Sequence, residues 1–192
     1  MNLCHSKLTD WGLQQISIEN RWTILDVGCG GGRTVSKLAA IATEGKVYGI
    51  DHSESSVAAT KRINAQSIDR GRVEVRQASV SHLPFPDNMF DLVTAVETHF
   101  WWPDLPGDIR EIFRILKPGG TVVLIAEVYK GAHTIAARLV EKAAPLTGLT
   151  LLTVEEHREL FKHAGYSDIR IIEEPRKGWI CGVSEKPIAG SR

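Results

Sequence analysis

The sequence predicts an α/β fold in which a parallel β-sheet is covered by helices on both faces. From Trp22 onward, short runs of β-branched residues alternate with amphipathic stretches, which is the pattern of successive βαβ units. The predicted strand at 90–96 is apolar almost throughout, as expected at the centre of a sheet that is buried on both faces. A length of 192 residues with 43% hydrophobic and 24% charged residues fits one globular domain.

Five predicted strand and helix repeats follow one another with short connections. The strands are expected at 24–27, 46–50, 73–76, 90–96 and 121–126. A first helix is expected at 33–42, a second from an N-cap at Ser53 to a break at Gly71, and a third through 105–116. That third helix is expected to end at the Lys-Pro-Gly-Gly segment 117–120. Pro84 and Pro86 predict a loop before the central strand.

The last third of the chain departs from simple repeats. Residues 131–149 are amphipathic through Ile135, Leu139 and Val140, which predicts an inserted helix over one edge of the sheet. Thr153 and Glu156 have the spacing of a capping box and predict the start of the final helix, with Gly165 after its end.

Two further strands are predicted at 169–173 and 179–184. Their connection is too short for a crossover helix, so they should pair antiparallel. Residues 1–21 are interpreted as a flap with a short helix that covers a sheet edge, 22–187 as one domain and 188–192 as a tail.

Charge and cysteine content argue against several classes of function. There are 23 Lys plus Arg and 23 Asp plus Glu, so the net charge of 0 predicts no general attraction to nucleic acid or a membrane. The cluster of Arg70, Arg72 and Arg76 is interpreted as a solvated edge, with a basic groove as the alternative. Three cysteines without a C-x-x-C pair, and no apolar leader or membrane span, predict a cytoplasmic protein without disulfides or metal.

The most informative segment is glycine-rich and lies between a strand and a helix. It reads ILDVGCGGGRT from Ile24 to Thr34, where glycines permit positive φ and let the backbone approach a bound nucleotide. The spacing is G-x-G-x-G preceded by Asp26, and not the dinucleotide pattern G-x-G-x-x-G, because Arg33 occupies the sixth position. A carboxylate here would repel a pyrophosphate and attract an ammonium or sulfonium. An ordinary glycine turn with a helix-capping Asp26 is the alternative.

A second acidic residue closes the next strand. Asp51 follows Gly28 by 23 residues, where a carboxylate can accept hydrogen bonds from ribose hydroxyls at the switch point of the sheet. His52 would then lie beside an adenine ring. The alternatives are a helix cap at Asp51 and a solvent-facing loop histidine at His52.

Four segments together resemble the class I S-adenosylmethionine-dependent methyltransferases of the small type 11 kind, over about 22–187. They are LDVGCGGG at 25–32, YGID at 48–51, LPFPDNMFDLV at 83–93 and REIFRILKPGGTVV at 110–123. The resemblance implies a Rossmann-like seven-stranded sheet of order 3-2-1-4-5-7-6 with the last strand antiparallel. It also implies S-adenosyl-L-methionine as cofactor and S-adenosyl-L-homocysteine as product.

The resemblance also implies which residues bind the cofactor. Asp26, the loop glycines Gly28, Gly30 and Gly32, and Glu97 would lie near its methionine part, and Asp51 would bind the ribose. Ser79 and Val80 would face the adenine edge. The family commonly has Asp where this chain has Ser79, and a hydroxyl accepts a hydrogen bond less strongly than a carboxylate.

The segment after the fourth strand is the predicted acceptor side. Strand carboxyl ends are where ligands bind in open α/β sheets, so His99 is predicted as a general base, with Trp101 and Trp102 walling the cleft. The alternative is aromatic packing under the next helix, with Glu97 as the cap of that helix. Tyr129, His133, His5 and Trp11 are weaker candidates, and no role is assigned to His82, His157 and His163.

The sequence therefore predicts methyl transfer from S-adenosylmethionine to an undetermined, small-molecule acceptor, without nucleic acid or membrane partners. Two alternatives stay open. One is a non-catalytic S-adenosylmethionine-binding sensor or partner-binding module. The other is an NAD-dependent oxidoreductase, which the glycine spacing and Asp26 disfavour.

Overall fold

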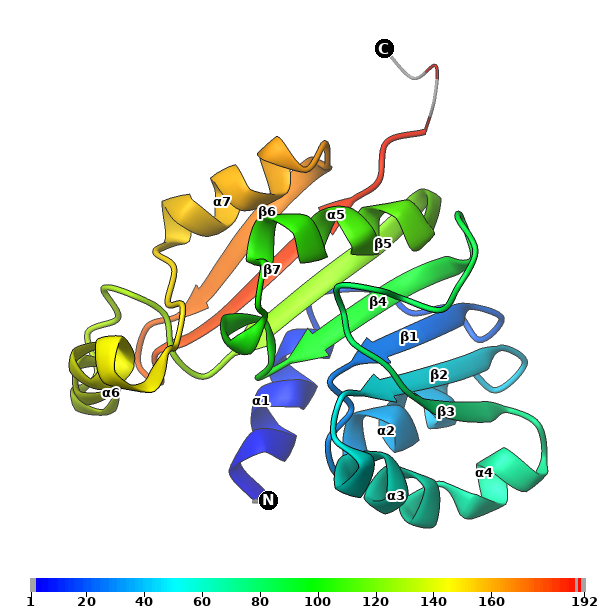
Figure 1. Ribbon diagram of the computed structural model, residues 1–192. Coiled ribbons are helices and arrows are strands. Elements are labelled where there is room, and N and C mark those ends of the chain that lie inside the picture. The colour runs from blue at the N-terminus through cyan, green and yellow to red at the C-terminus, as the bar shows by residue number, and fades with distance from the viewer. Residues whose placement is uncertain (1–2, 189, 191–192) are drawn as a thin grey trace.

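The computed structural model describes residues 3–188 and 190, with side chains described from Ser6 onward. Its strands form one seven-stranded sheet (Figure 1). They are β1 (Thr23–Val27), β2 (Lys46–Asp51), β3 (Val73–Gln77), β4 (Phe90–Val96), β5 (Leu116–Ala126), β6 (Ser167–Glu174) and β7 (Trp179–Glu185).

The strand order is β3-β2-β1-β4-β5-β7-β6. The five strands from β3 to β5 are parallel, whereas β7 pairs antiparallel with both β5 and β6. The order implied by the family resemblance and the antiparallel terminal pair predicted from its short connection are both confirmed. The apolar strand β4 does lie at the centre.

The helices also follow the predicted order, with local differences. They are α1 (Leu3–Leu13), α2 (Arg33–Ile41), α3 (Glu54–Ile63), α4 (Ala65–Asp69), the 3₁₀ turn η1 (His99–Trp101), α5 (Leu105–Ile115), α6 (Ile135–Thr147) and α7 (Val154–His163). The single helix expected from Ser53 to Gly71 is two, because Asn64 departs from helical geometry between α3 and α4. Strand β5 begins at Leu116, which pairs with Phe90 before a register shift, so α5 ends earlier than expected.

Helices cover the sheet on both faces, as predicted (Figure 1). Helices α1, α2 and α3 contribute to one apolar cluster and α5 and α7 to the other. Neighbouring residues of β4 point to opposite faces, so Leu92 joins the first cluster and Val93 the second. Burial on both faces explains why the strand is apolar along its length.

Helices α1 and α6 do not lie where the sequence suggested. The flap helix α1 packs on a face of the sheet, with Gly12 against Ile125 of β5, and does not cover an edge. Helix α6 lies beyond the carboxyl end of β5 (Figure 1), where Ala137 joins a third cluster with Phe100 and Tyr129. Among the described residues, no helix combines the length and apolarity needed to span a membrane.

Candidate functional site

The glycine-rich loop between β1 and α2 is fixed from two sides. The backbone N–H groups of Gly28 and Cys29 both donate to the Ile50 carbonyl of β2 at 2.8 Å. From α3, the Thr60 hydroxyl donates to the Gly30 carbonyl at 2.8 Å, and the Asn64 amide donates to the Gly32 carbonyl at 3.1 Å. Because both side chains are buried, these hydrogen bonds satisfy them and brace the loop from α3.

Two glycines of this loop are required for different reasons. Gly28 has φ +74°, and a Cβ there would collide with the Thr98 side chain at the end of β4. Gly32 has φ +79°, and its Cβ would lie 2.8 Å from the Thr60 Cα of α3. Gly28 therefore keeps space open at the strand ends, whereas Gly32 lets α2 and α3 approach each other.

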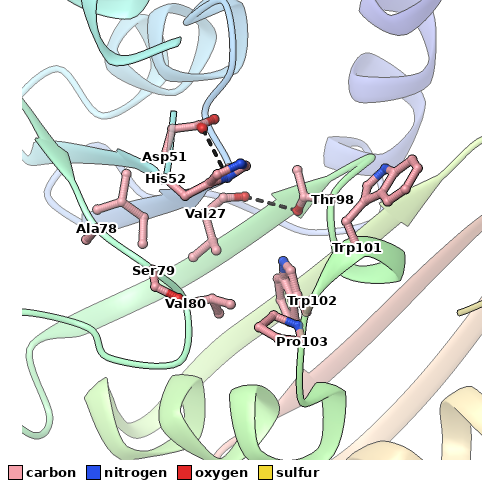
Figure 2. Close-up of a pocket in the computed structure, with 12 residues that line it drawn as sticks. Val27, Asp51, His52, Ala78, Ser79, Val80, Thr98, Trp101, Trp102 and Pro103 are labelled. Carbon is pink, nitrogen blue, oxygen red and sulfur yellow. Dashed lines mark hydrogen bonds and ion pairs between the residues drawn. The ribbon is translucent and has the colours of Figure 1, made fainter. Parts of the chain in front are cut away.

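A cavity of about 660 Å³ opens beside Gly28 at the carboxyl ends of β1, β2 and β3. Figure 2 shows Asp51 and His52 along one side, Ser79 and Val80 along another, and Trp102 with Pro103 opposite. Its wall is mostly apolar and contains no lysine or arginine. The lining residues are Val27, Gly28, Ile50, Asp51, His52, Ala78, Ser79, Val80, Thr98, Trp101, Trp102 and Pro103.

A second cavity, of about 440 Å³, lies on the other side of the same loop. It shares Gly28, Asp51 and Thr98 with the first cavity, and it differs in having lysine and arginine side chains among its lining residues. It is lined by Ser6, Thr9, Gly28, Cys29, Gly30, Gly31, Arg33, Thr34, Lys37, Asp51, Ala59, Arg62, Ile63, Val96, Glu97 and Thr98. The two cavities together form a bipartite site with one apolar part and one ionic part.

Asp51 lies at the junction of the two cavities. One carboxylate oxygen accepts from the Gly30 N–H and the other from the Ser53 N–H, each at 2.9 Å. The side chain of His52 is exposed, with its Nδ1 3.5 Å from the Asp51 carboxylate (Figure 2). Since each carboxylate oxygen has two lone pairs, Asp51 keeps acceptor capacity for a ligand hydroxyl.

Glu97 is a carboxylate without a cationic partner in the interactions described for it. It follows β4 with φ +60°, lines the second cavity and accepts the Glu127 backbone N–H. Burial, with the Glu127 charge adding to it, raises the pKa of Glu97 to about 8. A positive ligand group in this cavity would favour the ionised form.

Asp26 is buried beneath the loop and lines neither cavity. The Thr94 hydroxyl donates to it at 2.8 Å, yet burial still raises the pKa of Asp26 to about 7, with Asp51 contributing. Any attraction of Asp26 for a cationic ligand therefore acts through the loop and not by direct contact.

The predicted adenine-side residues do lie together in the first cavity. Val80 is buried, whereas Ser79 is exposed and its hydroxyl accepts the Ser81 N–H at 3.2 Å. This hydrogen bond occupies one of the two lone pairs with which the Ser79 hydroxyl could accept from an adenine, in place of the Asp that is common at this position in the family.

The structure does not bring His99 to either cavity, contrary to expectation. The ring is buried, and its Nε2 lies 3.4 Å from the Nε2 of His157, a residue to which the sequence assigned no role. Burial, with His157 adding to it, lowers the pKa of His99 to about 3. A buried ring that lines neither cavity cannot take a proton from a methyl acceptor bound there. The structure therefore does not support His99 as a general base.

The weaker candidates also lie away from the cavities. The Tyr129 hydroxyl donates to Glu173, and the Trp11 ring packs 5.7 Å from that of Trp179. His133 is exposed, and the side chain of His5 lies outside the described residues. No group of three or more potential metal ligands occurs in the part of the chain that the structure describes.

Several lining residues of the second cavity were not anticipated. Ser6 and Thr9 come from α1, which the sequence placed at a sheet edge, and Arg62 comes from α3. One signal was available, because Arg33 and Lys37 are four residues apart and therefore share a face of α2. Nothing local in the sequence indicated that Arg62 faces them.

Comparison with known proteins agrees with this geometry. A model of the "Methyltransferase domain" family matches residues 25–124. The methyltransferase YdaC of Bacillus subtilis is 28% identical over 94% of this chain and 92% of its own length. A demethylmenaquinone methyltransferase of Symbiobacterium thermophilum is 38% identical over 53% of this chain and 41% of its own. The chain spans about half the length of several curated relatives that it matches.

Among solved structures, the fold is similar to that of phosphoethanolamine N-methyltransferase 2 of Haemonchus contortus in complex with S-adenosyl-L-methionine. The TM-score is 0.80 at 19% identity, covering 94% of this chain and 52% of that one. Strand order, glycine loop and acidic strand ends define a class I S-adenosylmethionine-dependent methyltransferase. The chain belongs to the methyltransferase domain family, as its resemblance in sequence implied.

Proposed function

We propose that this protein transfers a methyl group from S-adenosyl-L-methionine to a small-molecule acceptor and releases S-adenosyl-L-homocysteine. The observation that carries the proposal is the bipartite site, whose apolar and ionic parts meet at Gly28, Asp51 and Thr98. An adenosine has an apolar ring system, and a methionine has a charged end, so the two parts match the two halves of the cofactor.

The residues present fit that cofactor on chemical grounds. The Glu97 carboxylate is half-buried and faces the charge of Glu127, and a sulfonium nearby would offset both costs of ionising it. Arg33 and Arg62 would attract the carboxylate of the methionine, and the apolar wall around Val80 would accept the adenine. Ser79, Val80 and His52 stay predicted adenine contacts, and Asp51 the predicted ribose acceptor.

In the proposed mechanism the chain acts chiefly by positioning. S-adenosylmethionine supplies a methyl group on a sulfonium, which is already a good leaving group. The Asp51 carboxylate, which is fixed by the backbone N–H groups of Gly30 and Ser53, would orient the ribose of the cofactor. Gly28 leaves free the space that a side chain would fill. Trp101 and Trp102 line the first cavity, where Trp102 is buried and Trp101 is exposed. Holding reacting groups in place can contribute roughly 7 to 11 kcal/mol to such a reaction.

The acceptor is proposed to be a small molecule. Curated relatives named as demethylmenaquinone and sterol 24-C-methyltransferases act on compounds of that size class. The two alternatives make different predictions: a sensor would bind S-adenosylmethionine without turnover, and an oxidoreductase would bind NAD. A sensor would use Glu97 in the same way, so only turnover distinguishes it from the methyltransferase proposal, whereas the glycine spacing and Asp26 disfavour an oxidoreductase.

Calorimetry with S-adenosyl-L-homocysteine tests the site directly. Asp51→Ala should weaken binding by about 1 to 3 kcal/mol, the cost of losing a charge-assisted hydrogen bond. Asp69→Asn, at the exposed end of α4, is the control and should bind as the wild type does. Wild-type affinity in Asp51→Ala would remove Asp51 from the site.

Turnover is tested by incubating the protein with methyl-labelled S-adenosylmethionine and a metabolite extract. We expect label in one small-molecule species whose mass grows by a CH₂ unit. Tight cofactor binding with no labelled product from any extract would favour the sensor, and calorimetric binding of NAD in its place would favour the oxidoreductase.

A further inference from the structure

Helix α6 presents large apolar side chains to solvent. Ile135, Leu139 and Leu146 are exposed by 80%, 63% and 90%. They are four and seven residues apart, so at 3.6 residues per turn they form one stripe along the helix. We call these three residues the α6 stripe.

The orientation of α6 differs from what the sequence suggested. Of Ile135, Leu139 and Val140, only Val140 packs against the protein, together with the buried Ala137 and Ala144. Ala137 packs in the cluster with Phe100 and Tyr129, where small residues fit. Three scattered apolar residues would be ordinary at a surface, but three on one stripe mark a face that meets another apolar phase.

The exposed charged residues of α6 itself have one sign. Arg138 and Lys142 are both exposed and lie between the stripe residues along the helix. The only acidic residue of α6, Glu141, is half-buried and accepts the Gly131 N–H at 3.2 Å. The accessible face of α6 therefore combines aliphatic side chains with positive charge, although the whole chain has a net charge of 0.

This charge pattern distinguishes between occupants. In a symmetric pairing of two α6 helices, Arg138 and Lys142 would approach the same cations of the second copy, with no exposed α6 carboxylate between them. A helical or extended peptide needs a groove, and neither cavity described here is lined by α6. An exposed apolar stripe flanked by cations fits the surface of a lipid bilayer, which has apolar acyl chains beneath anionic headgroups.

We infer that α6 is an interfacial helix that docks on an anionic lipid bilayer. The stripe would enter the boundary between headgroups and acyl chains, while Arg138 and Lys142 extend their charged ends to lipid phosphates. Helix α6 lies beyond the carboxyl end of β5 (Figure 1). Residues at the carboxyl ends of strands also line both cavities. When α6 docks, the side of the molecule that carries both cavities would face the lipid surface.

Sedimentation of the full chain with lipid vesicles tests the inference. We expect binding to phosphatidylglycerol vesicles, little binding to phosphatidylcholine vesicles, and release from phosphatidylglycerol as salt is raised. The triple variant I135S/L139S/L146S should bind at least about tenfold more weakly. R138Q/K142Q should lose the preference for the anionic lipid.

The matched control is Ile41→Ser, which changes an exposed aliphatic residue at the end of α2 and should bind vesicles as the wild type does. Equal S-adenosylhomocysteine binding in all variants establishes that they are folded, since α6 lines neither cavity. That readout also separates this inference from the proposed function, because either can fail alone.

Three outcomes would overturn the inference. They are a wild-type chain that does not sediment with phosphatidylglycerol, a triple variant that binds as well as the wild type, and a wild-type dimer in light scattering that the triple variant abolishes without any vesicle binding. The last result would assign the stripe to a second copy.

Discussion

The pKa of Glu97 predicts that this site discriminates the charged cofactor from its neutral product in a pH-dependent way. A sulfonium attracts the ionised form of Glu97, whereas the thioether of S-adenosylhomocysteine does not. Because burial raises the pKa of Glu97 to about 8, the ionised form is scarce at neutral pH. Preference for S-adenosylmethionine should therefore rise as the pH rises.

The magnitude follows from that pKa. Below the pKa, each pH unit costs about 1.4 kcal/mol to ionise the group, which is a factor of about ten in affinity. Between about pH 7 and about pH 9 the affinity ratio should grow about tenfold and then level off. Asp26 has a pKa of about 7, so it contributes mainly at lower pH.

Calorimetry with both ligands across this range measures the ratio. The Glu97→Gln variant is the reference for titration of the ligands' own amino groups, because the sulfonium lowers the pKa of that group in S-adenosylmethionine only. Glu97→Gln should flatten the dependence. A wild-type ratio that stays constant, or an equal rise in Glu97→Gln, would refute the reasoning.

Two further predictions concern stability. Gly32→Ala should lower the free energy of unfolding by about 1 to 3 kcal/mol, because the position has φ +79° and no room before Thr60; unchanged urea unfolding would show that the loop can shift. Burial lowers the pKa of His99 from 6.5 to about 3, so the unfolded chain binds a proton that the folded chain refuses. The contribution of His99 to the free energy of unfolding is therefore retained above about pH 6.5. The free energy of unfolding should fall by about 2 kcal/mol between about pH 6.5 and about pH 5. His99→Gln should reduce that slope in urea titrations, and an identical slope would exclude His99 as its source.

The sequence predicted those parts of the fold that depend on neighbours in the chain. The capping box is confirmed, since the Thr153 N–H donates to Glu156 at 2.7 Å and the Glu156 N–H to Thr153 at 3.1 Å. Ser53 caps α3 as expected. The acidic and glycine pattern of the loop was also readable, because a tight turn between a strand and a helix allows few residues.

What the sequence could not give depends on contacts between distant segments. His99 and His157 are 58 residues apart, and nothing near either one indicates that they meet in the core. The same holds for α6, where periodicity shows that a helix has two faces but not which face the protein buries. Arg62 likewise joins the second cavity only because α3 packs beside α2.

The double role of Asp51 couples ligand binding to local order. One carboxylate closes the turn that starts α3, through Ser53, and braces the neighbouring loop, through Gly30. A ligand that engages this group would therefore tighten both segments at once, and slower amide hydrogen exchange would spread into the first turn of α3, which touches no substrate. A spectroscopist could therefore follow occupancy of the site from backbone amides that line neither cavity.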